Sequence, residues 1–222
     1  MSRNPVIVFE GIEGSGKTLH VNHLSSYLKK RKIRFIKLRE PGGNTKSEKI
    51  RKLILSNNSN FHKITDLLLY FAARNENIVS LIKKNYGKKV ILIDRFVDST
   101  IAYQHYGMGI DYKFIKLINK FLTKKIKIDL TFLNLVSSRN LRLRLSKRKN
   151  LNRYDKFKIN FYNNVQRGYI KISNNNKRKY RIIDSNQAIS INKKKVIEEV
   201  AKLLKWTPIQ NFKQNYMVYL FI

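Results

Sequence analysis

The sequence predicts an α/β fold in which helices cover both faces of a parallel sheet of about five strands. Five short apolar or β-branched runs recur along the chain, and segments long enough for helices separate them. Strands that alternate with helices form parallel sheets, and runs that are apolar throughout indicate strands covered on both faces. The 222 residues suit one domain, so we expect residues 1–222 to form a single unit.

The strands are expected where β-branched and apolar residues cluster. These runs are residues 6–9, 33–38, 90–93, 130–135 and 180–184. Helices are expected where apolar residues recur on one face, which they do in residues 19–31, 64–84, 112–121 and 193–204. In the second of these helices, the apolar face is formed by Leu67, Leu68, Phe71 and Ile78, which are therefore expected in the core.

Two polar and positively charged segments, residues 146–156 and 173–179, are expected to be mobile connections rather than folded units. They are rich in lysine, arginine and asparagine and poor in apolar residues. The tail, residues 206–222, has no clear hydrophobic period, and its role is left open.

The chain is strongly basic, with 47 lysines and arginines, 14 acidic residues and a formal net charge of +33. Such a balance favours polyanionic partners. The basic residues are nevertheless spread along the chain without an RNA-binding motif, and lysine, asparagine and isoleucine dominate together, as in a composition shifted toward A/T-rich codons. We therefore expect no nucleic-acid partner.

Several other classes of protein are disfavoured by the composition. The chain contains no cysteine, which excludes disulfides and thiolate metal sites. No window approaches the ~18 apolar residues of a membrane span, and the first residues lack the apolar stretch of a signal peptide. We expect a cytoplasmic protein without a membrane partner.

The first expected strand runs directly into the sequence GIEGSGKT, which matches the phosphate-binding pattern G-x-x-x-x-G-K-[ST]. Glycines allow backbone N–H groups to converge on phosphate oxygens, and the next helix presents its positive N-terminal end to the same anion. Lys17 is expected to reach the β- and γ-phosphates, and Thr18 to ligate Mg²⁺. The expected ATP-binding residues are Gly11, Ile12, Glu13, Gly14, Ser15, Gly16, Lys17 and Thr18. The motif predicts a three-layer P-loop NTPase fold, a fold that ATPases, GTPases and small-molecule kinases share.

Polar residues that follow later strands would face the same crevice, because ligands bind where the carboxyl ends of parallel strands meet. Arg39 follows the second strand, either in a ligand-contacting turn or in a plain surface turn. Asp94 is placed to hold Mg²⁺ and Arg95 to bind a phosphate, unless the two form a pair that caps the next helix. One side of that helix would carry Ser99, Thr100, Tyr103 and Gln104 toward the crevice.

Two further groups are open to a functional or a structural interpretation. Tyr70 and Arg74 lie four residues apart on one helix, where they would present a ring and a guanidinium to one nucleotide or serve the core, as Phe71 does. The basic segment 142–153 would be a lid that brings an arginine onto the transferring phosphate, or an ordinary solvated face.

Several segments together resemble thymidylate kinase, the dTMP kinase family of P-loop nucleoside-monophosphate kinases. In chain order, over about residues 5–185, they are FEGIEGSGKT, REPGG, YFAAR, DRFVDSTIAYQ, IDLTFLNL, a basic stretch ending in NRYD, FYNNVQRGY and IIDSN. REPGG and DR-x4-T-x2-YQ are the most specific of these among P-loop kinases. The glutamate-bearing loop and the arginine-rich lid resemble the bacterial subtype.

The resemblance implies transfer of the γ-phosphoryl of ATP to dTMP, with dTDP and ADP as products, as a step toward dTTP. It implies Mg²⁺ as cofactor, held by Thr18 and Asp94, and a homodimer, since the family is usually dimeric. It also implies that Arg74 and Arg95 hold the acceptor phosphate, and that Tyr70 stacks on thymine. The substrate-binding residues that it implies are Glu13, Arg39, Tyr70, Arg74, Arg95, Ser99, Thr100, Tyr103 and Gln104.

The same resemblance places a transition-state arginine in a mobile lid of about residues 142–156, with Arg148 as the first candidate and Arg153 as the second. The catalytic residues that it implies are Lys17, Arg95, Arg148 and Arg153. Three positions depart from the family pattern. Asn134 replaces an aspartate, Ile128 replaces a proline, and Ser146 stands where another arginine is expected, which leaves the lid alignment open by a few residues.

Three alternative functions stay open from the sequence. The nearest is a kinase for another nucleoside monophosphate or for a deoxynucleoside. A different class is a basic, nucleic-acid-binding P-loop ATPase, which the charge of +33 would suit. The third is an inactive relative retained for binding, which the intact Lys17, Asp94 and Arg95 disfavour.

Overall fold

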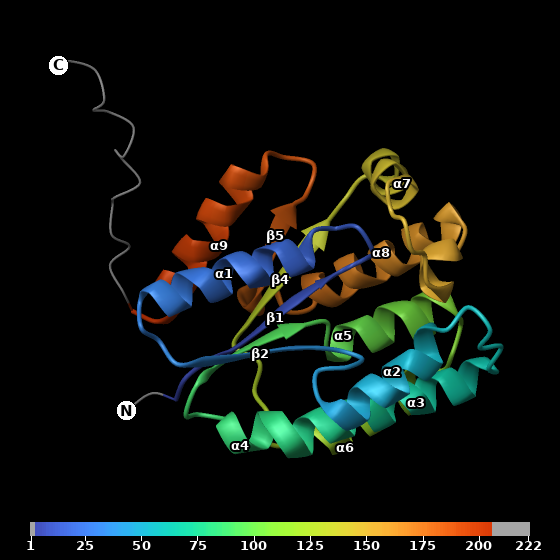
Figure 1. The fold of residues 1–222 in the computed structure, drawn as a ribbon, viewed down its shortest axis with the longest axis horizontal. Helices are drawn as coiled ribbons and strands as arrows, with labels where there is room; N and C mark the ends of the chain where they lie inside the picture. The colour runs from blue at the N-terminus through green and yellow to red at the C-terminus, as the bar shows by residue number, and fades with distance from the viewer. Residues whose placement is uncertain (1–2, 206–222) are drawn as a thin grey trace.

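The computed structural model describes residues 3–205, so the expectation for the tail, 206–222, lies outside the described residues. Five strands, β1 (Val6–Gly11), β2 (Phe35–Arg39), β3 (Val90–Asp94), β4 (Leu130–Leu135) and β5 (Tyr180–Asp184), form one parallel sheet in the order β2-β3-β1-β4-β5 (Figure 1). The predicted fold class and the five predicted strands are confirmed. The expectation of cover on both faces holds for the three central strands, whereas the edge strands β2 and β5 are partly exposed.

One face of the sheet is covered by α1 (Lys17–Lys30) and α9 (Ile189–Leu203), which pack together against it (Figure 1). Their apolar faces form a core with the side chains of β1 and β4 that point the same way. Its central members include Phe9, Leu24, Phe132 and Val196. This packing fixes the first turn of α1 at the end of β1, and with it the phosphate-binding loop.

The other face is covered by the remaining long helices, α3 (Lys63–Asn77), α6 (Tyr112–Thr123) and α8 (Ile159–Asn174), and by the short α4 (Lys83–Asn85) and α5 (Val97–Thr100). The helix predicted over 64–84 is present, but a π-helical turn, Ile78–Ile82, separates α3 from α4. Leu67 and Phe71 are buried as predicted. Leu68 is wrong as a core residue, because its side chain faces outward and is 50% exposed.

The helix α8 was not among the predicted elements, nor were two helices that follow the carboxyl ends of strands. α2 (Thr45–Leu55) packs on α3, and its first turn is capped by Asn44, whose side chain accepts hydrogen bonds from Lys46 N and Ser47 N at 3.0 Å. α7 (Ser138–Ser146) follows β4 and begins at an equivalent cap, Ser137. Both caps are local sequence signals for the start of a helix. Apolar periodicity alone does not reveal them.

The segment 146–156 is only in part the connection that was expected. Its second half forms a 3₁₀ turn, Arg153–Lys156, in which Tyr154 and Asp155 are buried. Similarly, the segment 173–179 contains the last two residues of α8 and a 3₁₀ turn, Lys177–Lys179. The expectation of connections rather than folded units was wrong at these turns. In the first turn, the buried side chains of Tyr154 and Asp155 order otherwise polar sequence. Among residues 3–205, no helix is long and apolar enough to cross a membrane.

Candidate active site

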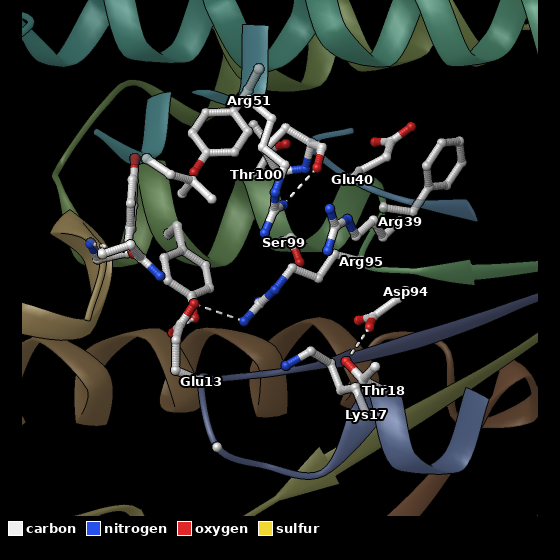
Figure 2. A pocket seen from close by; sticks show the side chains of 18 of the residues that line it. Glu13, Lys17, Thr18, Arg39, Glu40, Arg51, Asp94, Arg95, Ser99 and Thr100 are labelled. Carbon is white, nitrogen blue, oxygen red and sulfur yellow. Dashed lines mark hydrogen bonds and ion pairs between the residues drawn. The ribbon is translucent and has the colours of Figure 1, made fainter. Parts of the chain in front are cut away.

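A cavity of about 380 Å³ opens at the carboxyl end of the sheet, where β1, β2 and β3 finish at neighbouring positions (Figure 2). Most of the predicted site residues line it: Glu13, Gly14, Gly16, Lys17, Thr18, Arg39, Tyr70, Arg74, Asp94, Arg95, Ser99, Thr100, Tyr103, Gln104 and Arg148. The predicted residues outside this lining are Gly11, Ile12, Ser15 and Arg153. The structure thus brings together side chains from six separate segments that the sequence analysis had grouped.

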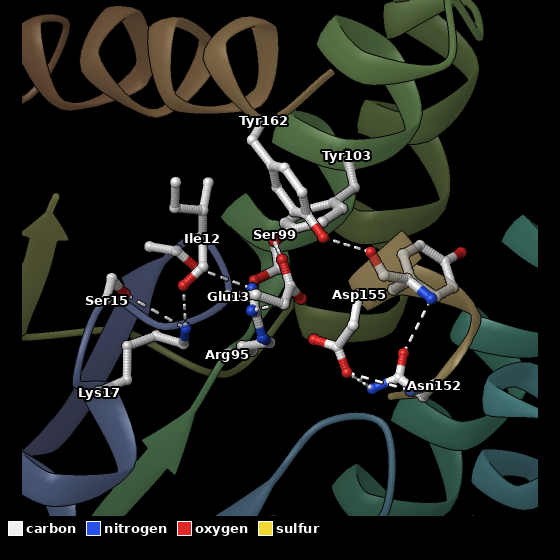
Figure 3. A network of polar contacts seen from close by, with 12 residues as sticks. Ile12, Glu13, Ser15, Lys17, Arg95, Ser99, Tyr103, Asn152, Asp155 and Tyr162 are labelled. Carbon is white, nitrogen blue, oxygen red and sulfur yellow. Dashed lines mark hydrogen bonds and ion pairs between the residues drawn. The ribbon is translucent and has the colours of Figure 1, made fainter. Parts of the chain in front are cut away.

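The phosphate-binding loop joins β1 to α1 and places Lys17 in the cavity wall. The Lys17 side chain is buried, and its ammonium group donates to the backbone oxygen of Ile12 at 2.7 Å (Figure 3). Burial, and after it the positive charge of Arg95, lowers the pKa of Lys17 to about 7. An anion in the cavity would raise this pKa again and keep the ammonium charged.

The backbone of the loop has the curvature of an anion-binding nest. Gly14 and Gly16 have φ angles of 67° and 86°, which side chains of L-residues rarely allow. The N–H of Gly16 has no hydrogen-bond partner among residues 3–205. At Gly11, a Cβ atom would lie 2.4 Å from the backbone oxygen of Asn134, so the loop leaves the sheet in direct backbone contact with β4.

Asn134, one of the three departures from the family pattern, is the β4 residue whose backbone makes this contact with Gly11. Its side chain is completely buried, and neither its amide oxygen nor its amide nitrogen has a partner among the described residues. The side chain lies on the sheet at the register position opposite Gly11 and is not part of the cavity lining. A buried amide without hydrogen-bond partners lowers the stability of the fold. The sequence did not reveal this cost.

Thr18 and Asp94 bring two oxygen donors together beside the loop. The Thr18 hydroxyl, at the start of α1, donates to Asp94 Oδ2 at the end of β3, at 2.6 Å (Figure 2). Hydroxyl and carboxylate oxygens suit Mg²⁺, which takes its other ligands from water and substrate phosphates. The described part of the chain has no group of three or more histidine, cysteine, aspartate or glutamate side chains able to hold a metal. The chemistry of the Thr18 and Asp94 oxygens fits Mg²⁺.

Arg95 crosses from β3 to the loop and joins it to the helix after β3. Its guanidinium donates to the Glu13 carboxylate and to the backbone oxygen of Gly11, both at 2.8 Å, and lies over the Tyr103 ring, 5.1 Å from the centroid (Figure 2). The Tyr103 hydroxyl donates to the other oxygen of Glu13. Burial works against the charge of Arg95, but the carboxylate of Glu13, together with Tyr103, Tyr169 and Asp94, outweighs burial and raises the pKa of Arg95.

Arg74 forms part of the cavity floor and is almost entirely enclosed. Its Nε donates to Glu40 Oε2 at 2.7 Å, Nη1 to Asn119 Oδ1 at 2.6 Å, and Nη2 to the Phe96 backbone oxygen at 2.9 Å and to Thr100 Oγ1 at 2.8 Å. All three nitrogens of the guanidinium are therefore engaged with protein groups. These contacts suit a residue that supports the floor of the cavity better than one that receives a phosphate.

Arg51, on α2, is a cavity residue that the sequence analysis missed. One terminal nitrogen donates to the backbone oxygen of Pro41 at 2.7 Å, and the other has no partner among the described residues. Burial lowers the pKa of Arg51, and the charge of Arg39 adds to that effect. Arg39, Arg51 and Arg95 place three positive charges around one cavity. An anionic ligand would reduce the repulsion between them. The helix cap at Asn44 is the sequence signal that could have placed Arg51.

The helical segment that follows β3 is irregular where it lines the cavity. After α5 it continues as a π-helical segment, Ile101–Gly107, and such segments are common at functional sites. Ser99 donates to the buried Glu10 at 2.5 Å, so its hydroxyl is held at the cavity floor. Gln104 is 1% exposed and its amide nitrogen has no partner within the described part of the chain, which leaves that donor for a ligand.

The two candidate lid arginines are held in different places, because each pairs with a different buried carboxylate. Arg148 lines the cavity and pairs with Asp155, whose side chain is 1% exposed. Arg153 pairs with Asp66 on α3 and donates to the Ser59 backbone oxygen at 3.0 Å, away from the cavity. The placement therefore favours Arg148, and does not support Arg153 as a group that meets a substrate.

The same turn approaches the aromatic wall of the cavity, where two more residues missed by the sequence analysis, Asn152 and Tyr154, contribute to the lining. The Tyr154 ring meets Tyr70 edge-on at 6.0 Å and Tyr103 at 6.1 Å between centroids. Tyr70 is thus fixed at the wall from one side, with its neighbourhood set by residues about 80 positions away in sequence. A flat, apolar ring would fit against this wall.

Comparison with known proteins agrees with this geometry. The family model described as thymidylate kinase matches residues 9–196. The chain is 40% identical to a thymidylate kinase of Sulfurihydrogenibium sp. over 82% of this chain and 90% of that protein, and 37% identical to a thymidylate kinase of Wolbachia pipientis over 75% and 84%. It is also similar to the crystal structure of thymidylate kinase from Ehrlichia chaffeensis, with a TM-score of 0.69, 31% identity, and coverage of 91% of this chain and 99% of that one. The chain belongs to the thymidylate kinase family.

Proposed function

We propose that this enzyme transfers the γ-phosphoryl group of ATP to the 5′-phosphate of dTMP, giving dTDP and ADP. The observation that carries the proposal is one cavity that holds a phosphate-binding loop on one side and a cluster of arginines with an aromatic wall on the other. Two nucleotides placed end to end would bring their phosphates together between Lys17 and Arg95. Family membership supports the choice of ATP and dTMP over other nucleotide pairs.

The reaction needs no covalent intermediate on the protein, because the acceptor phosphate is already an anionic nucleophile. An oxygen of the dTMP phosphate attacks the γ-phosphorus, and the bond from that phosphorus to the bridging oxygen of ADP breaks. Catalysis then consists of positioning and charge neutralisation. Lys17 and the loop amides would neutralise the donor phosphates, and Arg148 would meet the charge that develops on the transferring group.

We assign the acceptor phosphate to Arg51 and Arg95, with Arg39 at the rim. Arg51 has an uncommitted nitrogen facing the cavity, and Arg95 lines it beside Glu13. Arg74 would support this site from below through its pair with Glu40. This assignment replaces the expectation that Arg74 contacts the phosphate directly.

The base and sugar of dTMP would occupy the wall formed by Tyr70, Tyr103 and Gln104. Tyr70 supplies a ring face, and the amide nitrogen of Gln104 supplies a hydrogen-bond donor. Tyr103 and Glu13, joined by a hydrogen bond, would enclose the sugar. In this arrangement the thymine and the sugar are read by groups from three different elements.

Mg²⁺ would be held by Thr18 and Asp94, together with oxygens of the ATP phosphates. When bound, it would neutralise charge on the phosphates and orient them. We further propose that the enzyme acts in the cytoplasm, where its two nucleotide substrates are found.

We also propose a homodimer that buries an apolar face of α3 and α6. These helices pack side by side on the outside of the molecule (Figure 1). Leu68 on α3 and Leu117 and Phe121 on α6 are 50%, 66% and 78% exposed, which is a large apolar area for a free surface. Sedimentation analysis of the purified protein tests this proposal, and Phe121→Glu should yield monomers.

The activity is tested by mass spectrometry of the products formed from ATP, Mg²⁺ and an equimolar mixture of nucleoside monophosphates. Preferential formation of dTDP supports the proposal. Preferential formation of another nucleoside diphosphate, or ATP hydrolysis without transfer, contradicts it.

A further inference from the structure

The phosphate-binding loop is tied to two other elements on the side that faces away from the cavity. Arg144, on α7, donates from Nη1 to the Gly14 backbone oxygen at 2.7 Å and from Nη2 to the Ser185 backbone oxygen at 2.5 Å. The Ser185 hydroxyl donates to the Ser15 backbone oxygen at 2.6 Å. The loop, α7 and the turn after β5 thereby form a closed ring of hydrogen bonds. We propose that Arg144 and Ser185 are positioning residues that set the direction of the loop amides for ATP.

The argument rests on the geometry of the peptide bond. In a planar trans peptide, the C=O of one residue and the N–H of the next point in opposite directions. A hydrogen bond that holds the Ser15 oxygen on the outside therefore directs the Gly16 N–H to the inside. The same relation joins the Gly14 oxygen to the Ser15 N–H, which points toward the Ile12 oxygen at 3.3 Å.

The Gly16 N–H is the group on which this constraint acts. It has no partner among residues 3–205, and Gly16 lines the cavity at the start of α1. Because Gly16 adopts φ 86°, its peptide planes would turn easily without an external restraint. The hydrogen bond from Ser185 to Ser15 supplies that restraint, so the amide is aimed before any nucleotide enters.

The anchor itself is rigid. The backbone N–H of Ser185 extends the ladder of the sheet by donating to the Leu135 oxygen at 2.8 Å, and the Ser185 residue is 6% exposed. The next residue, Asn186, is held by Asp184 Oδ1, which accepts from its backbone N–H at 3.0 Å and from its side chain at 2.7 Å. The loop is therefore anchored to the sheet through β5 as well as through β1.

Arg144 is suited to this task by the shape of its side chain. Its two terminal nitrogens diverge in one plane, so one side chain can bridge two carbonyl groups from different elements. Gly14 lies directly against it, since a Cβ at that glycine would be in ordinary van der Waals contact with the Arg144 Cβ, at 3.5 Å. A lysine at this position would supply one point charge and could not reproduce the planar bridge.

The inference deepens the proposed function, and it is tested by binding rather than by turnover. Titration calorimetry of Mg·ADP and, separately, of dTMP is carried out on the wild type, Arg144→Met, Arg144→Lys and Ser185→Ala. We expect Kd for ADP to rise about tenfold in Arg144→Met and about threefold to tenfold in Ser185→Ala, the size of one lost hydrogen bond. Arg144→Lys should fall between wild type and Arg144→Met, and Kd for dTMP should stay within about twofold of wild type.

The matched control is Arg142→Met, on the same helix. Arg142 carries the same charge, is exposed and forms no ion pair or hydrogen bond in the described part of the chain, so its removal should leave Kd for ADP unchanged. Equal weakening by Arg142→Met would show that only the net charge matters. Parallel losses of ADP and dTMP affinity would show a general structural defect. Kd values within about twofold of wild type for both Arg144→Met and Ser185→Ala would also overturn the proposal. The ADP affinities do not depend on whether dTMP is the acceptor.

Discussion

Arg148 reaches the cavity in a pair with Asp155, a carboxylate that is almost completely buried in the turn that follows it in the chain. The carboxylate is also held by Asn152, whose backbone N–H and side-chain amide donate to Asp155 Oδ2 at 3.1 Å and 2.6 Å. Because two hydrogen bonds from Asn152 fix Asp155, it fixes Arg148 in turn. Arg153, five residues later in the chain, is turned away by Asp66.

The first prediction separates the two arginines. Arg148→Ala should lower kcat about 10²-fold to 10³-fold, because the charge that meets the transferring phosphoryl group is lost. Arg153→Ala should change kcat less than about threefold and lower the melting temperature, because it leaves Asp66 buried without its partner. Steady-state kinetics and thermal unfolding of the two variants decide the point. A larger kcat loss in Arg153→Ala than in Arg148→Ala would reverse the assignment.

The second prediction concerns Lys17. Lys17→Ala should lower kcat by at least about 10²-fold, since the donor phosphates lose their neighbouring positive charge. Its melting temperature should stay at or above that of the wild type, because the substitution removes a buried ammonium whose pKa is lowered to about 7. Near wild-type turnover in this variant would mean that the phosphate-binding loop does not hold the donor.

The third prediction follows from the sign of the Lys17 shift. The pKa of Lys17 in the free enzyme is about 7, and bound phosphates raise it, so nucleotide binding at pH 8 should take up a proton. The affinity contributed by this charge is fully present below pH 7 and declines as pH rises from about 7 toward the pKa of the complex. Calorimetry of Mg·ADP binding in buffers of different ionisation enthalpy measures the uptake. The same uptake in Lys17→Ala would assign it to another group.

The fourth prediction contrasts Arg51 with Arg74. Arg51→Ala should raise KM for dTMP at least about tenfold with little change in melting temperature, because its free nitrogen faces the cavity. Arg74→Ala should instead destabilise the protein by about 3–5 kcal/mol, because it leaves Glu40 and Asn119 buried without their partner. Chemical denaturation and dTMP kinetics are measured on both. A stable Arg74→Ala enzyme with a selective loss of dTMP affinity would restore Arg74 to the acceptor site.

The sequence predicted those parts of the molecule that depend on local pattern. The apolar runs identified all five strands, and they are clearest in the three central strands, which are covered on both faces. The loop from Gly11 to Thr18 is set by backbone conformation, and its glycine pattern is therefore visible in the sequence. The residues after each strand could be grouped because parallel strands end at one edge of the sheet.

Other parts depend on partners far away in the chain and could not be predicted from local pattern. Arg74 and Arg95 look alike in sequence and both line the cavity, but Glu40 and Asn119 engage the guanidinium of Arg74, while Arg95 pairs with Glu13 of the phosphate-binding loop. The choice between the lid arginines is made by Asp66 and Asp155 in the same way. Leu68 shows the complementary limit, because helical periodicity does not distinguish an apolar face in the core from one on the outside.

The two faces of the turn at Arg153–Lys156 make different contacts. One face presents the Tyr154 ring to Tyr70 at the aromatic wall, and the other carries the carboxylate that holds Arg148. A base stacked on Tyr70 would press on the same four-residue turn that aims the arginine at the phosphates. Acceptor binding at Tyr70 would therefore act on the turn that holds Arg148, and such coupling would restrain ATP from reacting with water while no acceptor is bound.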